Sequence, residues 1–462
     1  NHRWINSDRG VDLCSIIDEE LHAIFSFWSI EFLNEWKMMN ANANANANET
    51  EEMEMVKFRK HSFFVACQDF ALFTRNPKKK RTLIDMCSEK MVWKSQHQQF
   101  EELLDDNSDL IGLKNGIFDL ATNSFRSGKP EDYVSLTTKN EYVEYSWDHP
   151  IVKDILQFLT QVFPNEDVRN YACKLLASFL DGHLVEKFYI WTGVGGNGKS
   201  KLIELFQLAT GNYCGTLPVT LITGKRQSSS GATPELARMK GKRLGIMNES
   251  NHNDSIDLGL IKSTTGGDMM YARALHKDPI EFRPTFQMVL LCNKKPKRID
   301  STDMGAWRRI TILRFKSRFV DNPNPLNDCE YQKDVFLDQK LKIWKQGFFW
   351  ILTQYYALLK EEGNPEPEEV IKETDEYRES NDIVGHFLKE SIEPSQDGYV
   401  TLAQLFKAFL NFQLTEINEK SKMLQTEFEE HLTYKLGDFS APNRMKGWSG
   451  YKFKNVFQFF AP

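Results

Sequence analysis

One glycine-rich stretch decides the fold class. It consists of Gly193, Val194, Gly195, Gly196, Asn197, Gly198, Lys199, Ser200 and Lys201. Its first eight residues fit the P-loop pattern G-x-x-x-x-G-K-[ST]. An apolar run ending at Trp191 precedes it, and an apolar-periodic segment begins after it at Leu202. Because this order predicts a strand, a loop and a helix, the loop's backbone N–H groups and the helix start should together bind phosphate.

Lys199 and Ser200 supply the side chains that a nucleoside triphosphate needs at such a loop. The lysine of a P-loop reaches the β- and γ-phosphates, and the hydroxyl ligates Mg²⁺. We therefore predict that ATP and Mg²⁺ bind here. A chance glycine-rich loop is the alternative, but the strand and helix patterns on either side argue against it.

A carboxylate near this loop is expected on a neighbouring strand. The apolar run Arg243–Asn248 is followed directly by Glu249. Glu249 can polarise the attacking water or hold the metal's ligand shell. Many strands end in an acid, so an ordinary exposed glutamate is the alternative.

Short apolar runs beyond the loop predict the sheet itself. They are Lys187–Trp191, Arg243–Asn248, Phe286–Cys292 and Arg309–Phe315, and helical patterns lie between them. Such an alternation is typical of an α/β fold with a buried sheet. A long amphipathic helix is predicted over residues 333–361.

The remaining segments give coarser predictions. Asn-Gly and Ser-Gly turn signals in residues 110–138 indicate hairpins, and residues 152–182 indicate two helices broken around Pro164. Asn40–Asn48 alternates Asn and Ala, which predicts a disordered or poorly defined segment. Pro77–Arg81 is basic, and is either a solvated loop or a phosphate-contacting patch.

Composition excludes several classes of protein. The 462 residues include 58 Lys and Arg and 64 Asp and Glu, for a net charge of −6, so nucleic-acid binding must be local. The seven cysteines form no Cys-x-x-Cys pair, which argues against a zinc or disulfide scaffold and for a reducing compartment. No apolar stretch approaches the length of a membrane span. Because the chain starts at Asn1, we expect it to be a piece of something longer.

The stretch from residue 262 to residue 293 carries a family resemblance. Lys262–Asp268 reads KSTTGGD, the basic segment Arg273–Lys277 follows, and a strand ends at Asn293. Together with the P-loop and the acidic strand, this resembles the superfamily III helicases. It looks most like the primase-helicase of large cytoplasmic DNA viruses, of the poxvirus and African swine fever virus type. Leu113–Leu120, LKNGIFDL, resembles the domain before the helicase core in that family.

The resemblance implies an AAA+-like ATPase core in a hexameric ring that translocates on one DNA strand. It places Lys199 and Ser200 at the P-loop lysine and hydroxyl, and Glu249 at the acidic position, with Ser200 and Glu249 serving the metal. It places Asn293 where a polar residue orients the attacking water. His276 and Lys277 fall at the tip of a DNA-gripping hairpin. From spacing alone, that pair is equally well an ordinary solvated turn.

Two adjacent arginines match the family's arginine finger, which reaches the nucleotide of the neighbouring subunit. Arg309 is the first choice and Arg308 the runner-up. One departure from the family stands out, because Asn248 precedes Glu249 where many members have a second acid. Asp254 or Asp257 could assist.

The predicted organisation has five parts. They are residues 1–104, mostly helical; 105–185, a domain before the core that serves as an oligomerisation collar; 186–330, the ATPase core; 331–380, a helical extension and linker; and 381–462, a winged-helix-like domain. The last prediction rests on helices near Ile383–Glu390, Leu402–Phe412 and Glu427–Leu436, and on a turn with β-type flanks at Gly447–Val456.

The functional prediction is an ATP-dependent replicative DNA helicase. Its partners would be single-stranded and forked DNA, further copies of the chain, other replication proteins, and a primase domain in the same full-length protein, at a replication site in the host cytoplasm. The alternative is a nucleotide-switched DNA-binding or loading scaffold with little unwinding, which the single acid at Glu249 motivates.

Overall fold

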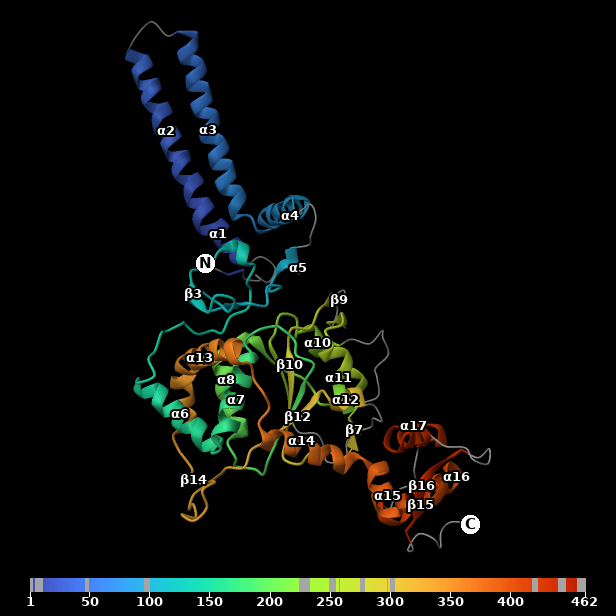
Figure 1. Ribbon diagram of the computed structural model, residues 1–462. Helices are drawn as coiled ribbons and strands as arrows, with labels where there is room; N and C mark the ends of the chain where they lie inside the picture. Colours follow the sequence, from blue (N-terminus) through green and yellow to red (C-terminus); the bar gives the residue numbers. More distant parts are fainter. Residues whose placement is uncertain are drawn as a thin grey trace. The chain divides into compact units, whose positions relative to one another are not determined.

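The computed structural model describes most of the chain. The described residues are 3–4, 11–45, 50–94, 100–223, 233–248, 255–256, 258–274, 279–296, 298–299, 304–417, 423–438 and 446–454. They divide into two compact units (Figure 1). The first contains Asn1–Asn107 and Lys129–Ser135, and the second contains Ser108–Gly128 and Leu136–Pro462.

The first unit is helical, as predicted. Its elements are α1 (Val11–Ile16), the π-helix η2 (Ile17–Leu21), α2 (His22–Ala45), α3 (Glu51–Arg75), α4 (Pro77–Lys94), α5 (Phe100–Leu103) and the 3₁₀ turn η3 (Pro130–Asp132). Helices α2 and α3 form an antiparallel pair, with Phe25 against Phe70 at 4.3 Å between ring centroids and Phe32 stacked on Phe63.

Two predictions for this unit differ from the structure. Helix α2 continues to Ala45, through much of the Asn/Ala segment predicted to be disordered, because alanine is the strongest helix former. Residues 46–49 lie outside the described residues. Pro77–Arg81 is not a loop, because these residues begin α4. The alternative, a phosphate-contacting patch, stays a prediction. The Asn76 side chain accepts hydrogen bonds from the N–H groups of Lys78 and Lys79 at 3.0 and 3.3 Å, which caps that helix.

The second unit begins with the predicted hairpins and helix pair. Strands β1 (Leu110–Gly112), β2 (Ile117–Asp119) and β3 (Ser124–Arg126) form an antiparallel meander. Helices α6 (Pro150–Val162) and α7 (Glu166–Ser178) follow, separated around Pro164. Asn165 caps α7 by accepting from the N–H groups of Asp167 and Val168.

A five-stranded parallel sheet forms the centre of this unit. Its strands are β4 (Phe188–Thr192), β5 (Cys214–Thr216), β6 (Leu244–Asn248), β10 (Gln287–Cys292) and β12 (Ile310–Arg314), in the spatial order β12-β4-β10-β6-β5. Four of these strands match the predicted runs to within one residue at each end. The prediction of an α/β fold is therefore confirmed.

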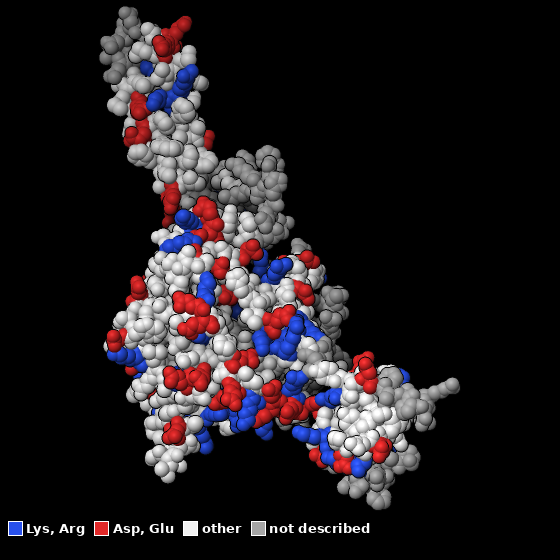
Figure 2. All heavy atoms as spheres, viewed as in Figure 1, with Lys and Arg blue, Asp and Glu red and all other residues white. Residues whose placement is uncertain are grey.

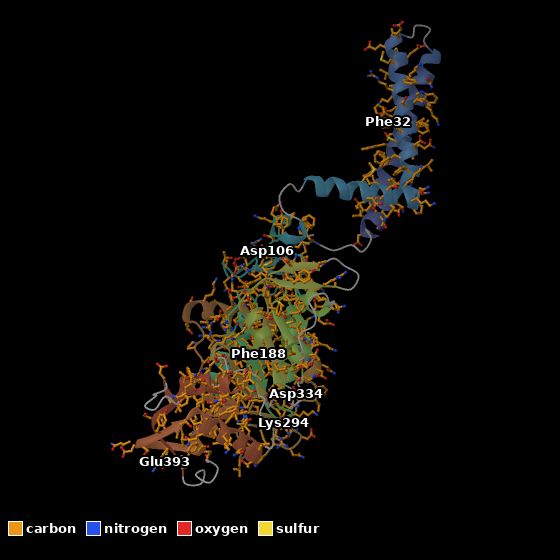
Figure 3. The ribbon with its side chains drawn as sticks, turned by 90° about the vertical axis from the view of Figure 1, so that its right-hand side faces the viewer. Phe32, Asp106, Phe188, Lys294, Asp334 and Glu393 are labelled. Atoms are coloured by element: carbon orange, nitrogen blue, oxygen red, sulfur yellow. The ribbon has the colours of Figure 1, made fainter. Side chains whose placement is uncertain are left out.

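The apolar runs are continuous because both faces of the sheet are covered. Along β4, Tyr189 and Trp191 join one buried cluster, whereas Phe188 and Ile190 join the cluster on the other face (Figure 3 labels Phe188). The first cluster includes Trp344 and Phe348 of the long helix α13 (Leu337–Glu362), the helix predicted over 333–361.

Smaller elements surround the sheet. They are α8 (Lys199–Thr210), η4 (Gly211–Tyr213), α9 (Thr220–Thr223), α10 (Pro234–Ala237), β7 (Ser255–Ile256) paired with β11 (Arg298–Ile299), α11 (Leu258–Thr265), β8 (Met270–Arg273) paired with β9 (Pro279–Phe282), α12 (Met304–Trp307), and β13 (Arg318–Val320) paired with β14 (Glu330–Gln332).

The C-terminal part has a hydrophobic cluster of its own. The elements of this part of the chain are α14 (Glu368–Asn381), α15 (Ile383–Ser391), β15 (Ile392–Thr401), α16 (Leu402–Phe412), η5 (Gln413–Ile417), α17 (Gln425–Leu436) and β16 (Gly447–Phe453). The buried residues of the cluster come from α15 onward. The rings of Phe387, Phe409 and Phe428 meet at its centre. The three predicted helices are present. The turn predicted within Gly447–Val456 is wrong, because Gly447–Phe453 forms one continuous strand, β16. That strand pairs with β15, which the sequence did not predict.

No described helix has the length and apolar character that crossing a bilayer requires. Figure 2 shows basic and acidic side chains interspersed over the face in view, in keeping with the small net charge of −6.

Candidate nucleotide-binding site

The glycine-rich loop has the backbone geometry that its sequence predicts. It connects the end of β4 at Thr192 to the start of α8 at Lys199. Gly193, Gly196 and Gly198 have backbone φ values of 151°, 79° and 82°, which residues other than glycine rarely adopt. A Cβ atom at Gly198 would also lie 2.9 Å from Cγ2 of Val162.

Part of the loop borders open space. A Cβ atom at Gly195 would meet no heavy atom within 4 Å. Asn197 is buried, and its Oδ1 accepts a hydrogen bond from the Lys199 N–H at 3.3 Å. Among the described residues, the Asn197 Nδ2 is one of the buried side-chain nitrogens with no hydrogen-bond partner. An open backbone turn with a spare buried donor fits a ligand that carries phosphate oxygens.

Lys199 lies at the centre of the site and is only 5% exposed. Its ammonium group donates to the Cys292 carbonyl at 2.6 Å and to the Gly193 carbonyl at 3.4 Å. It also lies 3.4 Å from Oδ1 of Asn293. The structure therefore brings together the P-loop lysine and the predicted water-orienting residue, which are 94 positions apart in sequence.

Three strand ends meet at this edge. In the sheet register, Cys292 pairs with Thr192 and Leu291 pairs with Asn248, so β4, β10 and β6 all end beside the loop. In open α/β sheets ligands bind at this carboxyl edge. Asn248 is exposed at the end of β6. Glu249, which follows it in sequence, lies outside the described residues.

Ser200 and Lys201 occupy the first turn of α8. Ser200 is exposed. Lys201 is held by other partners, since its ammonium group lies 2.6 Å from Asp338 and 2.8 Å from Glu204, and these hydrogen bonds raise its pKa. Lys201 therefore links α8 to α13 through its ion pair with Asp338. No group of three His, Cys, Asp or Glu side chains suited to a metal occurs among the described residues. Of the predicted metal ligands, Ser200 is described and its hydroxyl could bind a Mg²⁺ ion, whereas Glu249 is not described.

The two arginines lie at the opposite edge of the sheet. Arg309 directly precedes β12, whose first residue Ile310 pairs with Phe188 at the start of β4. The Arg309 guanidinium donates to the Gly305 carbonyl at 2.7 Å and lies 3.0 Å from the carboxylate of Glu186. Arg308 contacts the same carboxylate at 2.6 Å. The Arg309 side chain is 11% exposed and that of Arg308 is 64% exposed, so only Arg308 presents its charge at the surface.

His276 and Lys277 lie outside the described residues. The strands on either side of them are described, because β8 and β9 form an antiparallel pair in which Arg273 faces Pro279. In sequence, these two residues lie between the paired strands β8 and β9.

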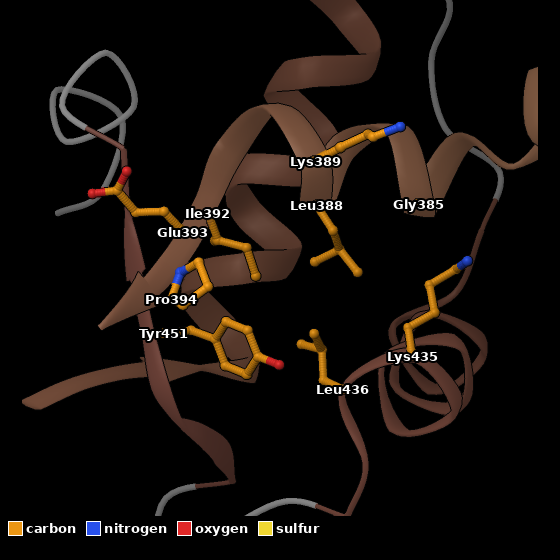
Figure 4. A pocket seen from close by; sticks show the side chains of 9 residues that line it. All are labelled: Gly385, Leu388, Lys389, Ile392, Glu393, Pro394, Lys435, Leu436 and Tyr451. Atoms are coloured by element: carbon orange, nitrogen blue, oxygen red, sulfur yellow. The ribbon is translucent and has the colours of Figure 1, made fainter. Parts of the chain in front are cut away.

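A pocket in the C-terminal part has no connection with this site. It has a volume of about 350 Å³ and an apolar floor that includes Leu388, Ile392 and Tyr451, with Lys435 at its margin (Figure 4). None of the predicted nucleotide-site residues lines it.

The sequence reading missed the acidic partners of the site's basic residues. Glu373 of α14 binds Lys295, which follows Asn293 by two residues, and Glu186 binds the arginine pair. No local pattern indicates these pairs, because the partners are 78 and 122 positions apart.

Comparisons with known proteins extend these observations. Residues 15–164 match the family model described as D5 N terminal like, and residues 191–309 match a family of unknown function, DUF5906. The chain is 40% identical over 294 residues to a protein of Acanthamoeba polyphaga mimivirus named "Putative helicase". The aligned residues cover 62% of this chain and 30% of that protein. It is 27% identical over 386 residues to a "Putative primase" of African swine fever virus, covering 79% and 40% respectively.

Among solved structures, the apo form of the NrS-1 C terminal region aligns with a TM-score of 0.40 and 13% identity, covering 68% of this chain and 78% of that one. The chain spans between 30% and 40% of the length of the two curated relatives named above.

Proposed function

Because the chain matches a viral primase-helicase family, we propose that it contains the ATPase of a replicative DNA helicase. The observation that carries the proposal is the meeting of Lys199 and Asn293 at the carboxyl edge of the sheet, beside the glycine loop. This edge has a phosphate-binding backbone, a buried cation and a polar side chain within one small volume. These are the groups that phosphoryl transfer needs, since catalysis there is mostly positioning and charge stabilisation.

Each residue has a defined part in the reaction. The loop's N–H groups bind the phosphates, and Lys199 neutralises charge on the β- and γ-phosphates. Ser200 and Glu249 would hold Mg²⁺, which when bound would neutralise charge on the phosphoryl oxygens. Glu249 also accepts a proton from the attacking water, which Asn293 orients toward the γ-phosphate. A single carboxylate carries this work, because Asn248 provides none.

The arginine pair serves a neighbouring copy. It lies at the amino edge of the sheet, whereas the loop lies at the carboxyl edge, and five residues of strand separate the edges by roughly 15 Å. An arginine there is too far from the phosphates of its own chain but is available to another chain's site. An arginine supplied in trans raises turnover about 10³–10⁵-fold, so hydrolysis would require assembly, for which we propose a hexameric ring.

DNA binding follows from the β8–β9 hairpin. His276 and Lys277 from several copies would line a central channel and bind phosphates of one strand. The C-terminal part, with three helices and the β15–β16 pair, would be a winged-helix-like domain. A primase domain and other replication proteins are the expected partners, at a replication site in the host cytoplasm.

The second candidate is a nucleotide-switched DNA-binding scaffold with little unwinding. The exposed amide Asn248, in the place of a second carboxylate, favours it. DNA-stimulated ATP turnover separates the two candidates, because a scaffold requires no stimulation.

The test of the first candidate is unwinding of a forked duplex by Lys199→Ala protein. We expect loss of both unwinding and ATP turnover, with the solution mass of wild-type protein rising when nucleotide and single-stranded DNA are added. Lys342→Ala, at an exposed lysine of α13, is the control and should behave as wild type. Unwinding by the Lys199→Ala protein would refute the assignment.

A further inference from the structure

Helix α14 covers the open edge of the central sheet. Among the described strands, β12 pairs only with β4, and its Ile312 N–H donates to the Thr374 hydroxyl of α14 at 3.0 Å. Lys316 and Glu369 pair at 2.9 Å. Tyr377, one turn beyond Thr374, is buried at 3% exposure within the cluster on one face of the sheet. The helix is therefore fixed to β12 at several points.

Glu373 of this helix binds two cations at the nucleotide-site edge. Its Oε1 lies 3.1 Å from the ammonium group of Lys295, and its Oε2 lies 3.3 Å from a guanidinium nitrogen of Arg314. The Glu373 side chain is 11% exposed, so water screens these pairs weakly. Arg314 is the register partner of Thr192, the residue before the glycine loop.

A second contact holds the segment that follows Asn293, at Lys295 and Pro296. The Tyr377 hydroxyl donates to the Pro296 carbonyl at 2.8 Å, and the Lys295 ammonium group lies 5.3 Å from the centre of the Tyr377 ring. Glu373 and Tyr377, one helical turn apart, thus hold Lys295 and Pro296 from one side.

The other end of this segment binds the P-loop lysine. Lys199 donates to the Cys292 carbonyl at 2.6 Å and lies 3.4 Å from Asn293 Oδ1. Residues 292–296 are therefore a short bridge with the P-loop lysine at one end and α14 at the other. A bridge of five residues has little freedom to move if both of its ends are fixed.

We propose that Glu373 is a positioning residue of the nucleotide site, which acts through Lys295 to fix Asn293 beside Lys199. The inference deepens the proposed ATPase function and rests on it. Glu373 would act through Lys295, without contacting the nucleotide itself. It sets the place of the amide that orients the attacking water, and a displacement of about 1 Å in such a group can lower turnover about 10²-fold.

The test compares Glu373→Gln with Glu369→Gln in the full chain. Glu369 is the matched control, because it lies one turn earlier on α14 and pairs with Lys316 rather than with the bridge. We expect Glu373→Gln to lower kcat about 10–100-fold while KM for ATP changes less than about threefold, since positioning affects the transition state more than binding. Glu369→Gln should keep wild-type kcat and KM.

A double variant distinguishes positioning from general destabilisation. If Glu373 acts through Lys295, then adding Glu373→Gln to Lys295→Met should lower kcat no further than Lys295→Met alone. Multiplying losses would overturn the proposal, and so would wild-type kcat in Glu373→Gln.

Hydrogen exchange provides a readout that is independent of turnover. The backbone amides of residues 292–295 should exchange faster in Glu373→Gln than in wild-type protein, whereas in Glu369→Gln they should exchange at the wild-type rate. Unchanged exchange rates would overturn the proposal that Glu373 holds the bridge, even in an inactive protein. An absence of wild-type turnover would instead overturn the proposed ATPase function, and the exchange rates would still decide whether Glu373 holds the bridge.

Discussion

The guanidinium of Arg309 and the carboxylate of Glu186 form an ion pair of 3.0 Å at the amino edge of the parallel sheet. The same carboxylate also binds Arg308. Glu186 therefore holds both candidate finger residues next to each other, with one buried and one exposed. The sequence alone could not separate two adjacent arginines, whereas their burial gives each a different expected phenotype.

Arg308→Ala should lower ATP turnover at least 10³-fold without changing the melting temperature, because Arg308 is the exposed member of the pair. Nucleotide affinity should stay the same, since the proposed finger would act on the site of a neighbouring subunit and not on that of its own chain. Turnover, fluorescent nucleotide binding and thermal unfolding measure the three quantities.

Arg309→Ala should instead lower the free energy of unfolding by about 1–3 kcal/mol, because it removes a buried cation that binds Glu186 and the Gly305 carbonyl. Mixing Arg308→Ala protein with Lys199→Ala protein should restore part of the turnover, since some interfaces then combine an intact loop with an intact arginine. No restoration at any mixing ratio would count against donation in trans.

Gly198→Ala and Gly195→Ala should differ sharply. Gly198 has a φ of 82° and a Cβ there would crowd Val162, so its substitution should cost about 1–3 kcal/mol of stability and abolish nucleotide binding. Gly195→Ala should keep wild-type stability, because the added methyl group enters open space. If that space receives the phosphates, Gly195→Ala should nevertheless weaken nucleotide binding. Wild-type affinity in a stable Gly195→Ala protein would place the phosphates elsewhere.

Lys277→Ala should weaken single-stranded DNA binding at moderate salt and reduce the slope of log affinity against log salt by about one. Basal ATP turnover should persist, because the β8–β9 hairpin is not among the elements that form the nucleotide site. Titrations of labelled DNA at several salt concentrations measure both effects, with Lys342→Ala as the control. An unchanged slope would remove the hairpin from the DNA interface.

The contribution of Glu373 to stability should depend on pH. Burial alone raises the pKa of this carboxyl group, but hydrogen bonds and charge from Lys295 and Arg314 outweigh burial and lower the pKa below its ordinary value of 4.5. Because the folded-state pKa is depressed, the stabilisation is present above the ordinary value and is lost as pH falls through the lowered one. The difference in unfolding free energy between wild type and Glu373→Gln should therefore shrink from pH 7 to pH 4. Equal differences at both pH values would contradict this.

The strands and the loop were predictable because their signals are local. Phe188–Thr192 is apolar without interruption since both faces are covered, and Gly193, Gly196 and Gly198 are needed for backbone angles fixed within the loop itself. Strand β15 was missed because Ile392–Thr401 includes Pro394, Asp397 and Gly398, which indicate a turn, and its partner lies some 50 residues later.

The site's ion pairs could not be predicted, because they join distant segments. Lys294, Lys295, Lys297 and Arg298 form one basic cluster in sequence. The fold pairs Lys295 with Glu373 and leaves Lys294 exposed. Lys201 similarly fits a nucleotide-site residue by position, yet its partners on α8 and α13 hold it. The packing of helices against the sheet decides which charged side chains remain exposed and can bind a ligand.

The covering of β12 by α14 also decides where this protein can be cut for expression. A shortened chain ending at residue 330, the predicted end of the ATPase core, would lack Thr374 and expose the backbone donors of an apolar edge strand. Such an edge is a template for pairing with other chains, so this fragment should form insoluble aggregates. A fragment extended to Asn381 keeps the covering helix and should remain soluble.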